Sequence, residues 1–99
     1  MKLALFARLV AKPGKEKEVA DFLRQGVDLA NQEATTLMWF ALRLGPTTFA
    51  IFDAFADEAG RQRHLAGPIA KALMGQAATL FAEPPAIEPL EVLGAKLPA

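Results

Sequence analysis

The sequence predicts an α+β domain of the ferredoxin-like type, in which an antiparallel sheet carries helices on one face. Three observations lead to this fold class. The strand and helix patterns follow the order βαββαβ, residues 37–55 form an aromatic-rich hairpin pattern, and the predicted strands are apolar on both faces. The chain has 99 residues, which is the length of one domain, and we assign residues 1–99 to it.

The N-terminal third of the chain predicts a strand followed by a helix. Residues 3–10 predict a strand with apolar side chains on both faces, and the turn Lys12–Lys15 ends this strand. From residue 15 to residue 31 the apolar period becomes helical, with Val19, Phe22, Leu23, Gly26, Val27 and Ala30 on one face. Gly26 in this face either permits a close approach to the sheet or a ligand, or is simply tolerated.

Residues 37–55 predict a β-hairpin around Gly45-Pro46-Thr47. A helix fits less well, because Gly-Pro interrupts the segment and because it is rich in aromatic and β-branched residues. In the first strand, Leu37, Trp39 and Ala41 point one way, and Met38, Phe40 and Leu42 point the other. Neither face has the regular polar residues of a solvent-exposed face, so we expect other protein elements to cover both faces.

The C-terminal half predicts an interrupted helix and a last strand. Asp57 can cap the helix start, Gly67-Pro68 divides the helical region, and Glu83-Pro84-Pro85 ends it. Residues 87–95 predict the final strand, in which Pro89 requires an edge or a bulge.

This layout leaves one face of the sheet without a cover from the same chain. A hydrophobic content of 53% is high for a soluble domain of this size. We therefore expect a homodimer in which two sheets pack face to face, burying on the order of 1,200–2,000 Å² or more.

Composition excludes several classes of function. Eleven basic and eleven acidic residues give a net charge of zero, which disfavours a nucleic-acid partner. No basic amphipathic helix or apolar run of about 20 residues points to a membrane. The N-terminus could be read as a signal peptide, but Arg8 interrupts its apolar run, so we expect a strand and a cytoplasmic protein. Cysteine and serine are absent, which removes thiol and serine nucleophiles, and no spacing predicts a metal site.

Few residues remain as candidates for chemistry. Arg8, Arg43 and Asp53 lie in predicted strands, His64 is the single histidine, and Trp39 is the single tryptophan. Asp53 could pair with either arginine or accept a hydrogen bond from Trp39, depending on the hairpin register. The alternative interpretation is structural: an ion pair at an interface, a flanking histidine and a core tryptophan. A mostly apolar cavity between helices and sheet would suit a flat hydrophobic small molecule.

The chain resembles the antibiotic biosynthesis monooxygenase superfamily. The resemblance is carried by LFARLVAKPGKEKEVADFL and TLMWFALRLGPTTFAIFDAFADEAGRQRHLAGPIAKAL, and it spans essentially the whole chain. It implies a dimeric α+β barrel. Some members oxidise polycyclic aromatic compounds with O₂ and no cofactor, other relatives bind and degrade heme, and several have no clear activity.

The family pattern is matched only in part. His64 corresponds to the helix histidine, and Trp39 resembles the strand tryptophan of the cofactor-free members. The asparagine of the heme-degrading members is missing, since Leu5, Phe6 and Ala7 stand on the first strand, and Phe52 and Phe55 stand where their tryptophan would be. A tyrosine that orients substrate in some members is also missing.

The main hypothesis is a cofactor-independent monooxygenase, with no metal, that oxidises an aromatic or quinol-like compound. Trp39 would stack on or bond to the substrate, His64 would take or relay a proton, and Arg43 or Arg8 would stabilise oxyanion charge. Asp53, Phe40 and Phe52 complete the candidate substrate-binding set. The alternative is a non-catalytic small-ligand-binding or structural dimer, and heme binding or degradation is a third hypothesis.

Overall fold

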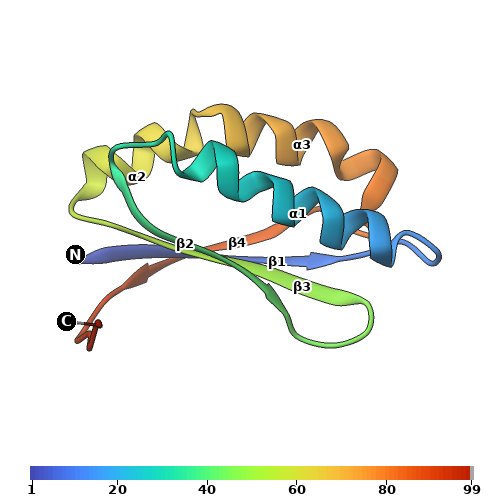
Figure 1. Cartoon of the computed structure of the whole chain (residues 1–99), viewed down its shortest axis with the longest axis horizontal. Helices are drawn as coiled ribbons and strands as arrows, with labels where there is room; N and C mark the ends of the chain where they lie inside the picture. The colour runs from blue at the N-terminus through green and yellow to red at the C-terminus, as the bar shows by residue number, and fades with distance from the viewer. Residues whose placement is uncertain (99) are drawn as a thin grey trace.

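A computed structural model of the protein describes residues 1–98 as one sheet covered by helices on one side (Figure 1). The elements along the chain are β1 (Leu3–Val10), α1 (Glu16–Ala30), β2 (Thr36–Arg43), β3 (Thr48–Phe55), α2 (Glu58–Leu65), α3 (Pro68–Leu80) and β4 (Ala86–Glu91). The predicted α+β, ferredoxin-like βαββαβ fold is confirmed, with the second helical region divided in two.

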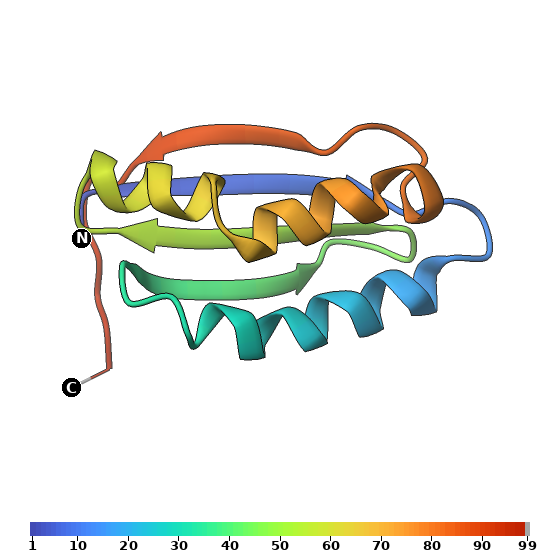
Figure 2. The same ribbon diagram turned by 90° about the horizontal axis from the view of Figure 1, so that it is seen from above.

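The sheet is antiparallel throughout, with the strand order β2-β3-β1-β4. Figure 2 shows α1 and the α2–α3 pair side by side above it. In the register, Asp53 of β3 lies between Leu5 of β1 and Trp39 of β2, so these three side chains share the helix-covered face. The register shifts between Thr36 and Met38, so Leu37 does not alternate regularly with Trp39 as the sequence suggested.

Local signals in the sequence explain where the helices begin. The Asp57 side chain accepts a hydrogen bond from the Gly60 N–H at 2.9 Å and thereby caps α2. Pro68 stands at the start of α3, where a missing N–H costs nothing, and the break at Gly67-Pro68 is as predicted.

The last strand is shorter than predicted. It ends at Glu91, opposite Leu3, instead of continuing to residue 95. β1 starts at Leu3, so β4 has no strand to pair with beyond that point, and a bond from Val92 N–H to the Lys2 carbonyl ends the pairing. Pro89 is accommodated because β4 is an edge strand, as expected.

The core lies between the helices and the sheet. Leu9, Val19 and Phe49 are at most 2% exposed, and they belong to one apolar cluster that also includes Leu23 of α1 and Leu73 of α3. Gly26 makes a close approach possible, since a Cβ there would lie 3.0 Å from Cη2 of Trp39. The first of the two interpretations of Gly26 is therefore correct.

The opposite face of the sheet has no cover within residues 1–98 (Figure 1). Phe40 and Leu42 on this face are 43% and 41% exposed. The rings of Phe40 and Phe52 stack there with centroids 6.3 Å apart. We call this surface the open face.

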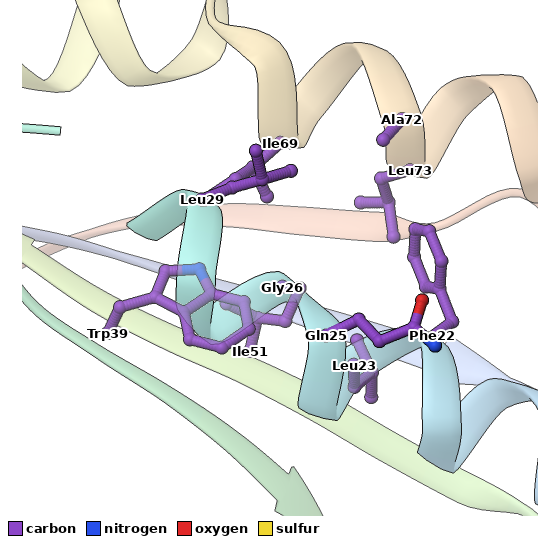
Figure 3. A pocket seen from close by; sticks show the side chains of 10 residues that line it. All are labelled: Phe22, Leu23, Gln25, Gly26, Leu29, Trp39, Ile51, Ile69, Ala72 and Leu73. Atoms are coloured by element: carbon purple, nitrogen blue, oxygen red, sulfur yellow. The ribbon is translucent and has the colours of Figure 1, made fainter. Parts of the chain in front are cut away.

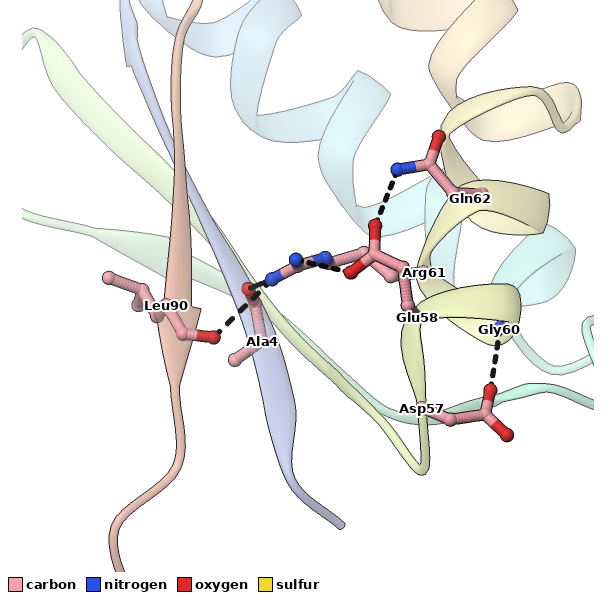
Figure 4. A network of polar contacts seen from close by, with 7 residues as sticks. All are labelled: Ala4, Asp57, Glu58, Gly60, Arg61, Gln62 and Leu90. Atoms are coloured by element: carbon pink, nitrogen blue, oxygen red, sulfur yellow. Dashed lines mark hydrogen bonds and ion pairs between the residues drawn. The ribbon is translucent and has the colours of Figure 1, made fainter.

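A cation ties α2 to the sheet edge (Figure 4). Arg61 donates to the backbone carbonyls of Ala4 in β1 and Leu90 in β4, at 3.3 and 3.4 Å, and also pairs with Glu58.

No helix formed by residues 1–98 has the length and apolarity needed to cross a bilayer.

Candidate active site

His64 lies between two carboxylates in the protein interior. Its Nε2 is 2.8 Å from Oδ2 of Asp53, and its Nδ1 is 2.7 Å from Oε1 of Glu33. The side chains of His64 and Asp53 are 7% and 2% exposed, and that of Glu33 is 14% exposed. Three titratable side chains are thus concentrated where most neighbours are apolar. We call them the acid–histidine cluster.

Three separate segments build this cluster. Asp53 comes from β3, His64 from the last turn of α2, and Glu33 from the turn that joins α1 to β2. Thr36 at the start of β2 donates its hydroxyl to Oε1 of Glu33 at 2.8 Å, and the Phe55 ring lies 5.4 Å from the imidazole between centroids. The imidazole is therefore fixed on both edges and packed on one side.

The geometry favours a protonated imidazole. Burial by itself lowers the pKa of His64, but hydrogen bonds and charge from Asp53 and Glu33 outweigh it, so the pKa lies above the usual 6.5. With both ring nitrogens donating, each carboxylate retains a second oxygen. Oδ1 of Asp53 and Oε2 of Glu33 are buried and have no hydrogen-bond partner in residues 1–98.

Two cavities lie side by side between the helices and the sheet. The smaller, about 30 Å³, is lined by Asp53 and His64. The larger, about 100 Å³, is lined by Trp39, and Figure 3 shows this cavity between α1 and α3. We call the larger one the tryptophan cavity. The two share the side chains of Ile51, Ile69 and Leu73, which form a partition.

The structure brings together only three of the predicted site residues. Trp39, Asp53 and His64 all lie on the helix-covered side, in the walls of these adjacent cavities. The expectation that Asp53 pairs with an arginine or with Trp39 is wrong: it pairs with His64, although Trp39 is its neighbour in the register. Nε1 of Trp39 is buried and has no hydrogen-bond partner among the described residues.

The other predicted site residues lie elsewhere. Arg8, Phe40 and Phe52 point to the open face, because each is an odd number of residues along its strand from a side chain on the covered face. Within one chain they do not line the cavity of His64, and their assignment to substrate binding stays a prediction.

Arg43 is also remote from the acid–histidine cluster. It lies four residues along β2 from Trp39, about 13 Å at the usual rise of a strand. Its guanidinium packs 4.6 Å from the centroid of the Phe49 ring, so a role in stabilising an oxyanion near His64 does not fit its position.

Glu33 is the residue that the sequence did not indicate. It stands in the polar segment between the first helix and the hairpin, where a solvated linker is the ordinary interpretation. Its partner His64 is 31 positions away, and no local pattern marks such a pair. Among residues 1–98, no group of three or more His, Cys, Asp or Glu side chains is arranged to hold a metal ion.

Comparisons with known proteins give a relative of high identity and further structures of the same fold. A crystal structure of NE2512 from Nitrosomonas europaea, a protein of unknown function, is 64% identical, with a TM-score of 0.96 over 99% of this chain and 95% of that one. A protein from the same organism, named provisionally as an antibiotic biosynthesis monooxygenase, is 16% identical, with a TM-score of 0.82 over 93% and 99% of the two chains.

A similarly named protein from Deinococcus radiodurans is 18% identical, with a TM-score of 0.78 over 98% of both chains. No family model and no curated protein matches the sequence. The similarity to the two monooxygenase-named structures bears out the resemblance at the level of the fold.

Proposed function

From the premise that this chain belongs to the same protein family as NE2512 and has the antibiotic biosynthesis monooxygenase fold, we propose that it is a monooxygenase. It oxidises an aromatic, quinol-like compound with O₂ and needs no cofactor. The observation that carries this proposal is the carboxylate of Asp53. One of its oxygens is held by His64, and the other is unpartnered beside an apolar cavity.

The chemistry requires a proton acceptor in a dry site. Removal of the phenolic proton leaves an anion rich enough in electrons to reduce O₂ by one electron, and the two radicals then join through a C–O bond. Cleavage of the O–O and C–H bonds with loss of water gives the quinone. One phenol and one O₂ thus yield one quinone and one water.

The residues divide this work differently from the hypothesis based on sequence. A His64 that already donates from both nitrogens is a poor base, so Asp53 takes the proton and His64 orients it. The positive imidazole also stabilises the negative charge that develops nearby, the role first given to Arg8 or Arg43. Trp39 contacts the substrate from the adjoining cavity.

Oxygen uptake with a panel of one-ring and multi-ring quinols and phenols tests the proposal. We expect Asp53→Asn, which keeps the shape but not the base, to lower the rate by about 10²-fold or more. The exposed Arg63→Gln, on the same helix as His64, is the control and should leave the rate unchanged. No uptake above the buffer rate, or full activity in Asp53→Asn, contradicts the proposal.

A non-catalytic binding or structural dimer is the second candidate. It is favoured by the size of the cavities, about 100 and 30 Å³, against roughly 300 Å³ or more for usual ligand sites. Native mass spectrometry of the purified protein, combined with the oxygen-uptake assay, separates them: a co-purified aromatic without uptake supports a binding protein, and neither ligand nor uptake supports a structural dimer. Heme binding receives less support because neither nitrogen of His64 offers a free lone pair to iron. Titration with heme, followed by the Soret band, checks this.

We further propose that the protein is a homodimer through the open face. Phe40 and Leu42 are more than 40% exposed there, beside the half-buried Phe52, and the face has no cover in residues 1–98. A second copy would shield the same residues on both chains at once. Light scattering at micromolar concentration gives the mass directly, and a stable monomer contradicts the proposal.

A further inference from the structure

The tryptophan cavity is almost entirely apolar. Its walls come from α1, β2, β3 and α3, and Figure 3 shows Ile69 over the indole of Trp39 and Leu73 farther along α3. Gln25 lines it from an exposed position on α1, so this is the side of the cavity nearest to solvent. Such walls select for an apolar body and offer few polar contacts.

One polar group of a residue that lines this cavity is unused. Nε1 of Trp39 is buried without a hydrogen-bond partner among residues 1–98. A buried N–H without a partner is costly, and an acceptor brought by a ligand would remove that cost. An indole nitrogen only donates, so the matching group on the ligand is a carbonyl, phenol or similar oxygen.

The size of the cavity limits what can carry that oxygen. About 100 Å³ is somewhat less than the roughly 150 Å³ that admits a benzene ring in an engineered protein cavity. Small side-chain shifts would therefore admit one ring. A longer ring system would have to cross into the smaller cavity, and the partition of Ile51, Ile69 and Leu73 stands in that path. Gly26 already lies against the indole, so the floor cannot retreat in that direction.

We infer that the tryptophan cavity binds a single six-membered ring bearing an oxygen acceptor, and that the partition excludes fused-ring compounds. The inference goes beyond the proposed function, because it concerns the tryptophan cavity alone, whereas the base Asp53 lies across the partition in the smaller cavity. It sets a ligand class of one-ring phenols or quinols. It also makes Ile69 and Leu73 specificity-determining residues, although neither offers a polar contact.

Trp39 provides the readout, because a protein with one tryptophan has one indole N–H resonance. In ¹⁵N-labelled wild-type protein, titrated without O₂, phenol should move this resonance downfield and bind about 2- to 10-fold more tightly than toluene, which lacks the oxygen. Two-ring 1-naphthol and three-ring anthrone should bind at least about tenfold more weakly than phenol.

Three variants test whether the walls decide this order. Ala72→Leu places a larger side chain in the cavity wall and should abolish phenol binding, whereas Ala78→Leu, on the same helix but exposed and outside the wall, should not. Ile69→Ala shortens the partition and should improve 1-naphthol binding about tenfold. If that variant does not fold, Ile69→Val should give a smaller change in the same direction.

Each outcome decides for or against the inference. Equal or tighter binding of anthrone by the wild type, an unmoved indole resonance with phenol, or unchanged phenol binding in Ala72→Leu overturns it. Because binding is measured without O₂, the expected ring order together with no oxygen uptake would reject the monooxygenase and keep the one-ring site. Oxygen uptake together with equal or tighter binding of anthrone would keep the monooxygenase and reject the one-ring site.

Discussion

Strand β3 presents two very different surfaces. On the helix-covered side it carries Phe49, Ile51 and Asp53, all at most 4% exposed, and the one charge among them has a partner from α2. On the open side it carries Phe52 between Ala50 and Ala54, and its neighbour Phe40 on β2 is 43% exposed. The strand is thus covered by helices on one side, while on the other its partly buried Phe52 and the exposed Phe40 beside it have no cover in residues 1–98.

The comparison teaches that the two sides of β3 have different physical requirements. The covered side needs charge balance, because a buried carboxylate without a counter-charge is expensive. The open side needs a second surface packed against it, because exposed aromatic rings gain free energy only when they are removed from water. Substitutions on the covered side should therefore change the unfolding free energy, and those on the open side should change the dissociation constant of a dimer.

The largest expected effect comes from breaking the covered side at His64. His64→Ala leaves Asp53 and Glu33 buried and close together with no cation between them, which should cost about 3–5 kcal/mol of unfolding free energy. Urea denaturation followed by circular dichroism measures this. The exposed neighbour Arg63→Ala should change stability by less than about 0.5 kcal/mol. Comparable losses in both variants would mean that the acid–histidine cluster is not an energetic unit.

The next effect breaks the open side at Phe40. If two copies meet there, Phe40→Lys should raise the dimer dissociation constant by roughly tenfold or more, equivalent to about 1.4 kcal/mol, with little change in the fold of the subunit. Sedimentation velocity over a concentration series reports it. Val27→Lys on α1, at 41% exposure, matches the change on the helix side and should leave the mass unaltered. A wild type that is monomeric at all concentrations would contradict the proposed dimer through the open face.

A smaller effect sharpens the description of the covered side at Gly26. An added methyl group would meet Trp39 at 3.0 Å, so Gly26→Ala should destabilise the protein by about 1 kcal/mol, the clash outweighing the gain in helix propensity. Gly75→Ala in α3, where no atom lies within 4 Å of the new methyl group, should instead stabilise by up to about 1 kcal/mol. Thermal unfolding of the two variants gives the signs, and equal signs would refute the close packing of the indole.

The smallest expected effect is a pH dependence confined to the covered side. The folded-state pKa of His64 lies above 6.5, so its stabilising charge is fully present below that pH and is lost as pH rises through the folded value. The unfolding free energy of the wild type should therefore fall above pH 6.5 relative to that of His64→Gln. Urea unfolding of both proteins from pH 5 to 9 gives the difference, and a constant difference would argue against a charged imidazole.

Much of the fold could be predicted because its signals are local. The strand at residues 3–10 and the helix before the hairpin follow from apolar period, and the division at Gly67-Pro68 follows from backbone chemistry. The end of β4 could not, because it is set by where β1 begins, some 90 positions earlier in the chain.

The site was only partly predictable for a related reason. His64, Asp53 and Trp39 could be named, but the pairing of Asp53 with His64 and the part played by Glu33 depend on contacts between distant segments. The alternation of side chains already placed Phe40 opposite to Trp39. That rule, applied to the candidate list, would have removed Phe40 from a site containing Trp39 within one chain.

The guanidinium of Arg61 has a consequence for the order in which the molecule comes apart. By bonding to carbonyls on both β1 and β4 from α2, it joins the outermost strand to a helix that follows the hairpin, so β4 cannot peel away by itself. Amide protons of β4 and α2 should therefore exchange with solvent as a single cooperative unit. Arg61→Met should let the strand fray while the helix stays protected.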